Sequence, residues 1–479
     1  MQQHDPNEPH SPKTPAAPTR VNADDRVAAL CDTDGKKNKR SRRTPYAIVA
    51  VMSLLLYADL FTQPACVQPQ SIGVDEAEVD AAGGGGGGGD DRVDAAGVSP
   101  EGGDASDAGS DASDAGSDAS DAGADGSACT TLLTLQPTSY ALGNNAAGLA
   151  AGVFNAGAAI DVVVTNRSTT AKAGVLLGSG GGAFGTVAPF TTTVNPLAVA
   201  VGDINGDTNA DLVAVGSSGA GNPGAVSVLL GNGDGTFQTH MPYATGAGSG
   251  NVVLGDVNGD TMLDVLTSNF HANTVSVLLG NGDGTFQAET TAATGTEPVG
   301  IALGKVNADA FLDIVVVNQA SGTVSVLLGN GNGTFQAKQD FATAAGATAV
   351  ALADLNGDTF LDVVIASGNT SGVSVLLGNG DGTLKPKVDY VTGNGPYAVA
   401  LGDVSRDGKL DIVASVAGGQ GVDVLRGKGD GTFALRETIA TPGEYPTNLT
   451  LGDFNGDGKL DAVVTNDNNN LQVLLNTCP

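Results

Sequence analysis

Tryptophan is absent from this chain, aromatic residues make up 4% of it, and lysine and arginine number 22 against 52 aspartates and glutamates. The net charge of −30 argues against a nucleic-acid partner, because such a protein needs basic groups to replace the counterions of the phosphates. The lack of tryptophan also disfavours a lectin that stacks sugars on indole rings. The 71 glycines follow no three-residue period, which excludes collagen. A content of 41% hydrophobic residues favours a folded β domain joined to segments of biased composition.

The first 128 residues divide into three segments outside the folded domain. Residues 1–45 are rich in proline and polar groups and basic near their end, so we expect disorder. The apolar run within 46–66 indicates a signal peptide, a lipoprotein signal with Cys66 as the lipidated residue, or an uncleaved membrane anchor. Residues 67–128 form an acidic linker of glycine, serine, aspartate and alanine, which we expect to be disordered. It is either a tether or a tail without function.

From Cys129 onward a unit of about 50 residues occurs seven times. Each unit holds an acidic loop of the form Asp-x-Asn-x-Asp-x-x-x-Asp, or its remnant, between two apolar runs. A third apolar run follows, and in six units a glycine turn such as Gly-Asn-Gly-Asp-Gly-Thr-Phe leads to a fourth. The loops begin at Val153, Asp203, Asp256, Lys305, Asp354, Asp403 and Asp453. Four strands per unit and seven units predict an all-β fold, a seven-bladed β-propeller over 129–479, with an open solenoid as the alternative.

The two ends of the repeat region favour a closed ring. The seventh unit stops after its third strand, and Thr131–Leu135 provides a strand before the first unit. This N-terminal strand is therefore predicted to complete the last blade. Cys129 precedes that strand and Cys478 follows the last one, so we predict a Cys129–Cys478 disulfide, with two free thiols as the alternative.

The acidic loops are candidate calcium sites. Positions 1, 3, 5 and 9 carry carboxylate or amide oxygens, and a backbone carbonyl at position 7 can complete the six to eight oxygen ligands that calcium takes. Five copies are intact, and about five ions are expected. Their candidate ligands are Asp203, Asn205, Asp207, Asn209 and Asp211; Asp256, Asn258, Asp260 and Asp264; Asp354, Asn356, Asp358 and Asp362; Asp403, Ser405, Asp407 and Asp411; and Asp453, Asn455, Asp457 and Asp461.

Two loops have lost ligands. The first copy keeps one carboxylate, Asp161, and should hold no metal. The fourth has Lys305 at position 1, whose ammonium is expected to form a salt bridge with Asp309 or Asp313 in place of an ion. Residues 129–479 hold 30 acidic and 12 basic groups, so five divalent ions would reduce the charge from −18 to about −8. The alternative is that aspartate, asparagine and glycine form turns only, and the glycine turns themselves are expected to be structural hairpins.

Together, the five acidic loops and the repeated Leu-Leu-Gly-Asn-Gly-Asp-Gly-Thr-Phe resemble the FG-GAP/VCBS repeat proteins, which share the propeller of integrin α-subunits. The resemblance covers 129–479. It implies calcium between the first two strands of a blade, on the face opposite the usual ligand surface, and a role in adhesion or ligand binding. The Phe-Gly mark itself is degenerate, since Phe184 is followed by glycine but Phe237 by Gln238.

We expect a non-enzymatic, exported protein that is tethered to the cell envelope or secreted, and that binds an extracellular protein or glycan as a monomer. Membrane contact would come through the N-terminal anchor or lipid, and no nucleic-acid partner is expected. Loops opposite the acidic loops, with Phe270 and His271, are candidates for recognition. Two alternatives are a lyase-like enzyme acting on polysaccharides and a purely structural surface protein. The enzyme is disfavoured because the repeats hold two histidines, His240 and His271, and no cluster of basic residues.

Overall fold

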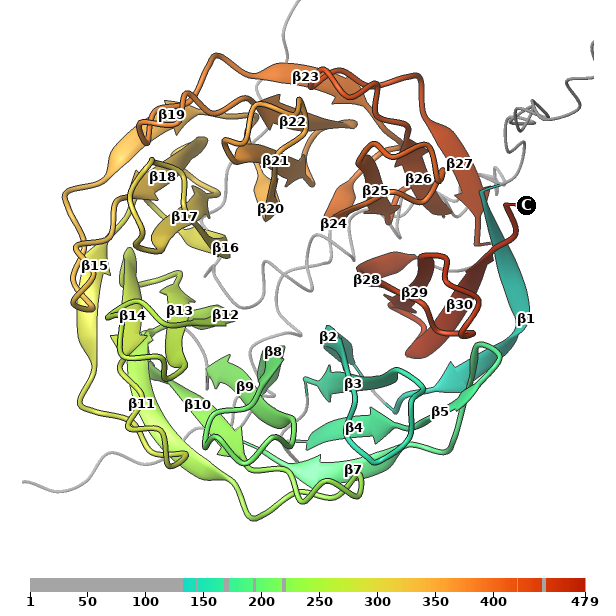
Figure 1. The fold of residues 1–479 in the computed structure, drawn as a ribbon, viewed down its shortest axis with the longest axis horizontal. Coiled ribbons are helices and arrows are strands. Elements are labelled where there is room, and N and C mark those ends of the chain that lie inside the picture. Colours follow the sequence, from blue (N-terminus) through green and yellow to red (C-terminus); the bar gives the residue numbers. More distant parts are fainter. Residues whose placement is uncertain are drawn as a thin grey trace, which may run out of the picture. The chain divides into compact units, whose positions relative to one another are not determined.

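A computed structural model describes residues 132–143, 145–167, 172–192, 195–217, 221–419, 421–441 and 445–478. The segments 1–45, 46–66 and 67–128, together with Cys66 and Cys129, lie outside the described residues, so the predictions for them stay predictions. Within the described residues, seven four-stranded antiparallel sheets form a ring of blades around a central axis (Figure 1). The predicted all-β, seven-bladed propeller is confirmed. None of the described residues belongs to a helix long and apolar enough to span a membrane.

The strands of each blade run in chain order from the central axis outward. Blade 1 comprises β2 Ala146–Gly152, β3 Asp161–Asn166, β4 Lys172–Leu176 and β7 Ala188–Thr191. Blade 2 comprises β8 Pro196–Gly202, β9 Asp211–Ser217, β10 Pro223–Leu229 and β11 Met241–Ala247. Blade 3 comprises β12 Ser249–Gly255, β13 Asp264–Asn269, β14 Thr274–Leu278 and β15 Thr290–Ala293. Blade 4 comprises β16 Pro298–Gly304, β17 Asp313–Asn318, β18 Thr323–Leu327 and β19 Gln339–Ala342.

The remaining blades follow the same order, and the last one takes its outer strand from the start of the domain. Blade 5 comprises β20 Ala347–Ala353, β21 Asp362–Ser367, β22 Gly372–Leu376 and β23 Val388–Val391. Blade 6 comprises β24 Pro396–Gly402, β25 Asp411–Val416, β26 Gly421–Leu425 and β27 Glu437–Ala440. Blade 7 comprises β28 Pro446–Gly452, β29 Asp461–Asn466, β30 Asn470–Asn476 and β1 Leu133–Ala141. A two-stranded hairpin, β5 Gly178–Gly180 and β6 Ala183–Phe184, lies within the first glycine turn.

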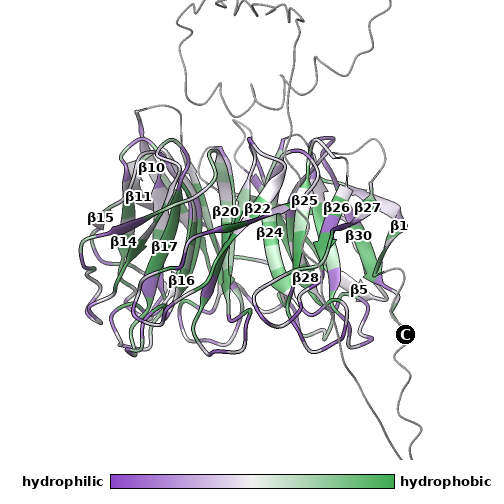
Figure 2. Cartoon of the chain, turned by 90° about the horizontal axis from the view of Figure 1, so that it is seen from above, coloured by the Kyte–Doolittle hydropathy of each residue, from purple (hydrophilic) through white to green (hydrophobic). Residues whose placement is uncertain are grey.

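Burial follows the position of each strand in its blade. The second strands are buried on both faces because neighbouring blades cover them, and they are continuous apolar runs such as Ile314–Val317. The first strands use small residues because they approach one another near the axis. A Cβ at Gly148 of β2 would lie 2.6 Å from the Cα of Ala198 in the next blade. Figure 2 shows the hydrophobic colour in the blade strands and hydrophilic loops at both rims.

The ring closes as the sequence predicted. β1 pairs with β30 in antiparallel register, with Leu133 opposite Asn476, so the N-terminal strand completes blade 7. It extends further than the predicted Thr131–Leu135, because Ser139–Ala141 also pairs with β30 beyond a register shift. Cys478 is disulfide-bonded and 2% exposed. Its predicted partner, Cys129, lies outside the described residues, so this pairing stays a prediction.

Candidate functional site at the acidic loops

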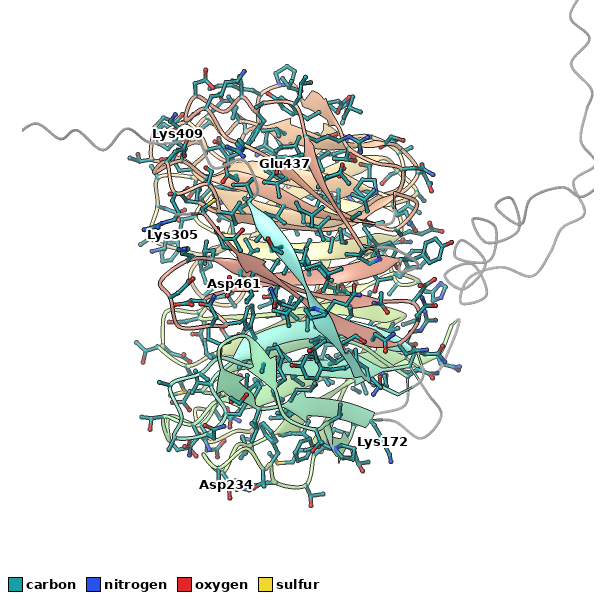
Figure 3. The ribbon with its side chains drawn as sticks, turned by 90° about the vertical axis from the view of Figure 1, so that its right-hand side faces the viewer. Lys172, Asp234, Lys305, Lys409, Glu437 and Asp461 are labelled. Carbon is teal, nitrogen blue, oxygen red and sulfur yellow. The ribbon has the colours of Figure 1, made fainter. Side chains whose placement is uncertain are left out.

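All seven acidic loops join the first strand of a blade to the second, so they lie together on one face of the ring. In Figure 3, Lys305 and Lys409, which belong to two of these loops, lie toward one face, and Lys172, at the start of a third strand, lies toward the other. The described chain begins and ends at the acidic-loop face, because Leu133 pairs with Asn476 and the Asn476 N–H donates to Asp461 at 2.7 Å.

The intact loops share internal hydrogen bonds from the N–H groups of positions 5 and 6 to position 1 and from that of position 7 to position 5. The Asp203 loop shows these bonds together with others from Gly206 and Asn205. One carboxylate oxygen of Asp203 accepts the backbone N–H groups of Gly206 and Asp207 at 2.8 and 3.1 Å, and the other accepts that of Thr208 at 2.8 Å. Asn205 Nδ2 donates to Asp207 at 3.0 Å, and Asp207 accepts the N–H of Asn209 at 2.8 Å. The backbone therefore wraps around the position-1 carboxylate, while the position-3 and position-5 side chains remain at the surface.

Two residues of each intact loop adopt positive φ. At position 6, Thr208, Thr261 and Thr359 have φ between 70° and 72°, and the other two copies have Gly408 and Gly458, both at 79°. A β-branched residue pays a steric cost in this left-handed region, so surrounding contacts must hold it there. Position 4 is also left-handed in all five intact loops, at Gly206, Gly259, Gly357, Arg406 and Gly456. In the two degenerate loops, positions 4 and 6 are not left-handed. The five loops with complete ligand sets are thus the five that share this backbone.

The position-9 aspartate has a role that the sequence analysis missed. It is 0% exposed in every blade, and each of its oxygens accepts at least one backbone N–H. One N–H comes from position 2 of the same loop, at 2.8–3.0 Å. The other comes, at 2.7–2.9 Å, from the glycine that opens the glycine turn, two residues after the third strand; in blade 7 it comes from Asn476, the last residue of β30. The residues are Asp161, Asp211, Asp264, Asp313, Asp362, Asp411 and Asp461.

The persistence of Asp161 and Asp313 in the two degenerate loops was the sequence signal for this role. A carboxylate needed only for a metal would have no reason to remain where the other ligands are lost. The position-9 aspartate therefore has a structural function in all seven blades, which ties the acidic loop to the next turn of its own blade.

Burial gives these aspartates unusual electrostatics. Desolvation raises the pKa of Asp211, and the nearby charges of Asp207 and Asp203 raise the pKa further. Asp264 and Asp362 show the same combination with their own loop aspartates. Carboxylates of one intact loop thus repel one another, and a cation between them would relieve the repulsion.

Position 2 of each loop connects neighbouring blades. Its apolar side chain is at most 5% exposed in all seven copies, from Phe154 to Phe454. Its carbonyl accepts a backbone N–H from the glycine turn of the next blade, as from Gly235 to Phe154 at 2.8 Å and from Gly333 to Val257 at 3.1 Å. Blade 7 has no glycine turn, and there Asn476 Nδ2 donates to the carbonyl of Val404 at 2.8 Å. The acidic loops are therefore parts of the blade junctions.

The fourth loop differs from the expectation for Lys305. Lys305 is exposed, and no ion pair of its ammonium with another described residue is found. The expected salt bridge with Asp309 or Asp313 is therefore not present in this structure, because Asp313 is engaged by backbone N–H groups of Val306 and Gly329. Lysines pair with a loop aspartate in two other copies, Lys409 with Asp407 at 3.5 Å and Lys459 with Asp457 at 3.7 Å.

The donor chemistry of the intact loops suits a hard cation, since every candidate ligand is an oxygen. Across the described ranges, however, no group of three or more histidine, cysteine, aspartate or glutamate side chains converges as a metal centre would. The position-9 oxygens point to backbone N–H groups, whereas the residues at positions 1, 3 and 5 of the intact loops are not buried. A carboxylate oxygen that accepts one N–H keeps further acceptor capacity, so position 9 could still contribute.

The glycine turns are structural, as expected. In blade 2 the Asp234 carboxylate accepts the backbone N–H and the hydroxyl of Thr236, at 2.9 and 2.5 Å, and Gly231 pairs with Phe237. The same bonds recur at Asp283, Asp381 and Asp430.

The expectation for Phe270 was wrong. Its side chain is 4% exposed and, although it comes from the β13–β14 turn of blade 3, belongs to an apolar cluster whose other residues come from blades 4 and 5. His271 stacks edge-on against the Phe270 ring at 5.3 Å. The other histidine, His240, lies 3.2 Å from Ser227 Oγ, at the place where blades 4 and 5 have the Ser325–Asp340 and Ser374–Asp389 hydrogen bonds. His240 thus takes part in a cross-strand structural contact.

The fold and its loops define a closed β-propeller in which each blade carries an acidic loop between its first two strands. The FG-GAP-like repeat matches residues 213–267, 256–316, 305–365, 354–414 and 413–464, and the FG-GAP repeat matches residues 195–229. These matches span more than half of the chain, and the protein belongs to the FG-GAP repeat family. No curated protein matches it.

Solved structures share the architecture at low sequence identity. BBS1N in complex with ARL6DN, soaked with mercury, has a TM-score of 0.51 and 12% identity, with 73% of this chain and 98% of that one covered. An Agrocybe aegerita lectin that recognises terminal N-acetylglucosamine has a TM-score of 0.46 and 21% identity, over 63% and 81%. A Pseudomonas aeruginosa periplasmic gluconolactonase has a TM-score of 0.46 and 15% identity, over 59% and 83%. At these identities the similarity concerns the fold alone.

Proposed function

We propose that this protein is an exported, calcium-stabilised propeller that binds an extracellular protein or glycan, and that it is tethered by its N-terminal region. The observation that carries the calcium proposal is the correspondence between ligand set and backbone. The five loops with complete oxygen donors share two left-handed residues, and the two degenerate loops lack them. In four of these loops at least one of the two is a threonine or an arginine, and a non-glycine residue held at positive φ is characteristic of sites whose conformation serves a ligand.

Positions 1, 3 and 5 of each intact loop would hold the ion, with the position-7 carbonyl and the position-9 carboxylate as further oxygens. When bound, calcium would supply the positive charge that offsets the repulsion among the loop carboxylates. The loop residues themselves orient the donors, because the backbone N–H groups of positions 4 to 6 hold the position-1 carboxylate in place, as at Asp256.

The proposed calcium stoichiometry is tested by two substitutions at the same loop position. Asp260→Ala removes the position-5 carboxylate of an intact loop, and we expect it to lower bound calcium from about five ions to about four per chain. Asp309→Ala makes the same change in the Lys305 loop and should leave about five. Elemental analysis after equilibrium dialysis measures both. Absence of calcium from the wild-type protein, or an equal loss in both variants, would refute the proposal.

The ligand-binding role is favoured by the direction in which the chain leaves the propeller. The described residues begin and end at the acidic-loop face, so a tether formed by 67–128 would place the opposite face away from its point of attachment. That face carries the turns between second and third strands, such as those after β17 and β25, on a rigid frame. An array of extracellular proteins and glycans, probed in the presence of calcium, tests the role. Turnover of an acidic polysaccharide would instead favour the lyase-like alternative.

A further inference from the structure

The outer edge of the propeller has a repeated contact between neighbouring blades. One register position of the fourth strand lies opposite a buried apolar residue near the start of the third strand. In six blades it carries a large apolar or aromatic side chain: Phe190, Tyr243, Phe341, Tyr390, Ile439 and Tyr140. Blade 3 is the exception, because Ala292 lies opposite Val275.

In most blades this side chain packs against the last residue of the glycine turn in the next blade. Phe190 meets Phe237 at 4.9 Å between ring centroids, and Tyr243 meets Phe286 at 5.3 Å, both edge to face. Tyr390 with Phe433 at 5.3 Å and Tyr140 with Phe184 at 5.6 Å repeat this arrangement. Edge-to-face packing is a preferred geometry of aromatic pairs, so the fold shapes a ring-sized space beside each turn.

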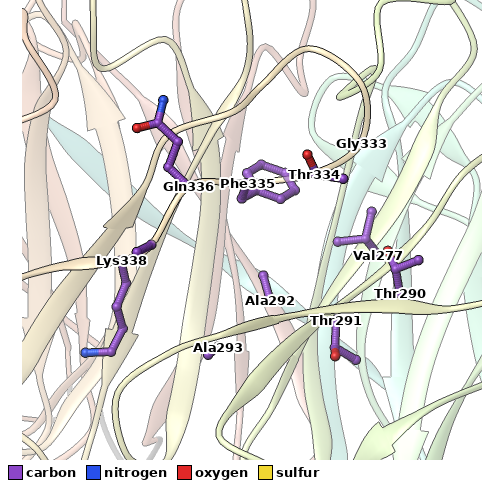
Figure 4. A pocket seen from close by; sticks show the side chains of 11 residues that line it. Val277, Thr290, Thr291, Ala292, Ala293, Gly333, Thr334, Phe335, Gln336 and Lys338 are labelled. Atoms are coloured by element: carbon purple, nitrogen blue, oxygen red, sulfur yellow. The ribbon is translucent and has the colours of Figure 1, made fainter.

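Blade 4 supplies the turn residue, Phe335, but blade 3 supplies no ring to meet it. The space beside Ala292 is a cavity of about 400 Å³ between the two blades. Figure 4 shows Phe335 on one side and Val277, Thr290 and Ala292 on the other. This volume is in the range of pockets that hold small ligands.

We propose that this cavity is a binding site for the aromatic side chain of a phenylalanine or tyrosine on an extended segment of a partner protein. In four other junctions a ring from an extended strand fills the equivalent space, and the wall that meets such a ring, here Phe335, is retained. β15 is the outermost strand of its sheet, so the cavity adjoins an edge with free peptide groups.

The polar lining fits this occupant better than a sugar. Thr290, Thr291 and Gln336 can bond peptide groups or a phenol hydroxyl, and no carboxylate lines the cavity. The charged residue of the lining, Lys338, is paired with Asp340. A sugar with many hydroxyl groups would have no carboxylate in this lining to accept its hydrogen bonds. No acidic-loop carboxylate takes part, so the site goes beyond the calcium-dependent function and does not depend on it.

The test uses the full-length protein with methyl-labelled alanine and valine and two probes, N-acetylphenylalanine amide and N-acetyltyrosine amide. We expect saturable NMR shifts of the Ala292 and Val277 methyl groups, and none from N-acetylalanine amide. A wild-type protein whose methyl groups do not shift with either aromatic probe would overturn the proposal. So would a response to methyl glucoside in place of the aromatic amides.

Ala292→Phe supplies the missing ring from the protein itself. We expect this variant to bind the probes at least about tenfold more weakly, with a higher Tm than wild type, because a filled junction resembles the other blades. Ala440→Phe, at the exposed position of β27 in blade 6 that corresponds in register to Ala293 and lies outside the cavity, is the matched control and should leave the affinity unchanged. Unchanged probe binding by Ala292→Phe, or a lower Tm, would contradict the proposed site. Should Ala292→Phe not fold, the wild-type titration still decides.

Discussion

Removing the position-9 aspartate of the Lys305 loop isolates the structural role of these residues from any role in metal binding. Asp313 is 0% exposed and accepts the N–H groups of Val306 at 2.9 Å and Gly329 at 2.8 Å. Asp313→Ala leaves both buried N–H groups without a partner. Each such group costs about 1–3 kcal/mol.

Part of that cost is offset. Burial raises the pKa of Asp313, because removing the carboxylate from water destabilises its charged form. Alanine carries no charge, so the variant does not have this desolvation cost. Two unpaired groups would together cost about 2–6 kcal/mol. Because of the offset, we expect a net loss of about 3 kcal/mol in the free energy of unfolding, near the lower end of that range.

Equilibrium unfolding in urea measures the loss from the shift in midpoint. Asp309→Ala is the matched control, since Asp309 is an exposed carboxylate of the same loop, and it should change stability by less than about 0.5 kcal/mol. Because this loop lacks the position-1 carboxylate, the loss at Asp313 should be the same in calcium and in chelator. A loss below about 1 kcal/mol, or one that chelation abolishes, would refute the structural role.

Three further predictions follow from the loops and the closure. Thr208→Gly should stabilise the protein by about 1 kcal/mol, because glycine adopts φ of 71° without steric cost, whereas Ala310→Gly at the same position of the Lys305 loop should give no gain in urea unfolding. Burial raises the pKa of Asp161 in the folded protein above its usual value of 3.8. The folded state therefore binds this proton more tightly than the unfolded state. The resulting stabilisation is fully present below pH 3.8 and is lost as the pH rises through the raised pKa. The difference between wild type and Asp161→Ala, measured in urea, should therefore widen from about pH 7 to about pH 4, and a constant difference would contradict this. Tyr140→Phe removes the hydrogen bond between the Phe184 N–H and the Tyr140 hydroxyl, at 3.0 Å, and should cost about 1 kcal/mol in the same assay; an unchanged midpoint would show that this bond does not stabilise the closed ring.

Much of the fold could be predicted because the repeated sequence indicates both the strands within a blade and the number of blades. The turn chemistry of the glycine-rich segments and the apolar runs sets the strands of each blade. The count of units and the missing fourth strand in the last unit then imply the pairing of β1 with β30. The closed ring of blades can therefore be predicted from the number of units and strands, without any knowledge of side-chain packing.

The acidic loops could be predicted only in part. The spacing of Asp203, Asn205 and Asp207 identifies the loop, but the same residue types serve as metal ligands and as acceptors of backbone N–H groups. Sequence spacing alone does not distinguish these roles, and the role of Asp211 as an acceptor of two backbone N–H groups appears only in the structure. Phe270 was misplaced for a related reason, since an aromatic residue in a turn can face solvent or fold back into the core.

The sequence by itself determined the number of blades, the order of strands and the positions of the acidic loops, because these depend on periodicity along the chain. Only the tertiary structure decided which residues of different blades meet. The backbone N–H groups that Asp313 accepts come from its own loop and from the turn after the third strand, and the space beside Ala292 lies between two blades. Contacts between blades join residues that no local pattern relates, so their chemistry appears only after the sheets have packed.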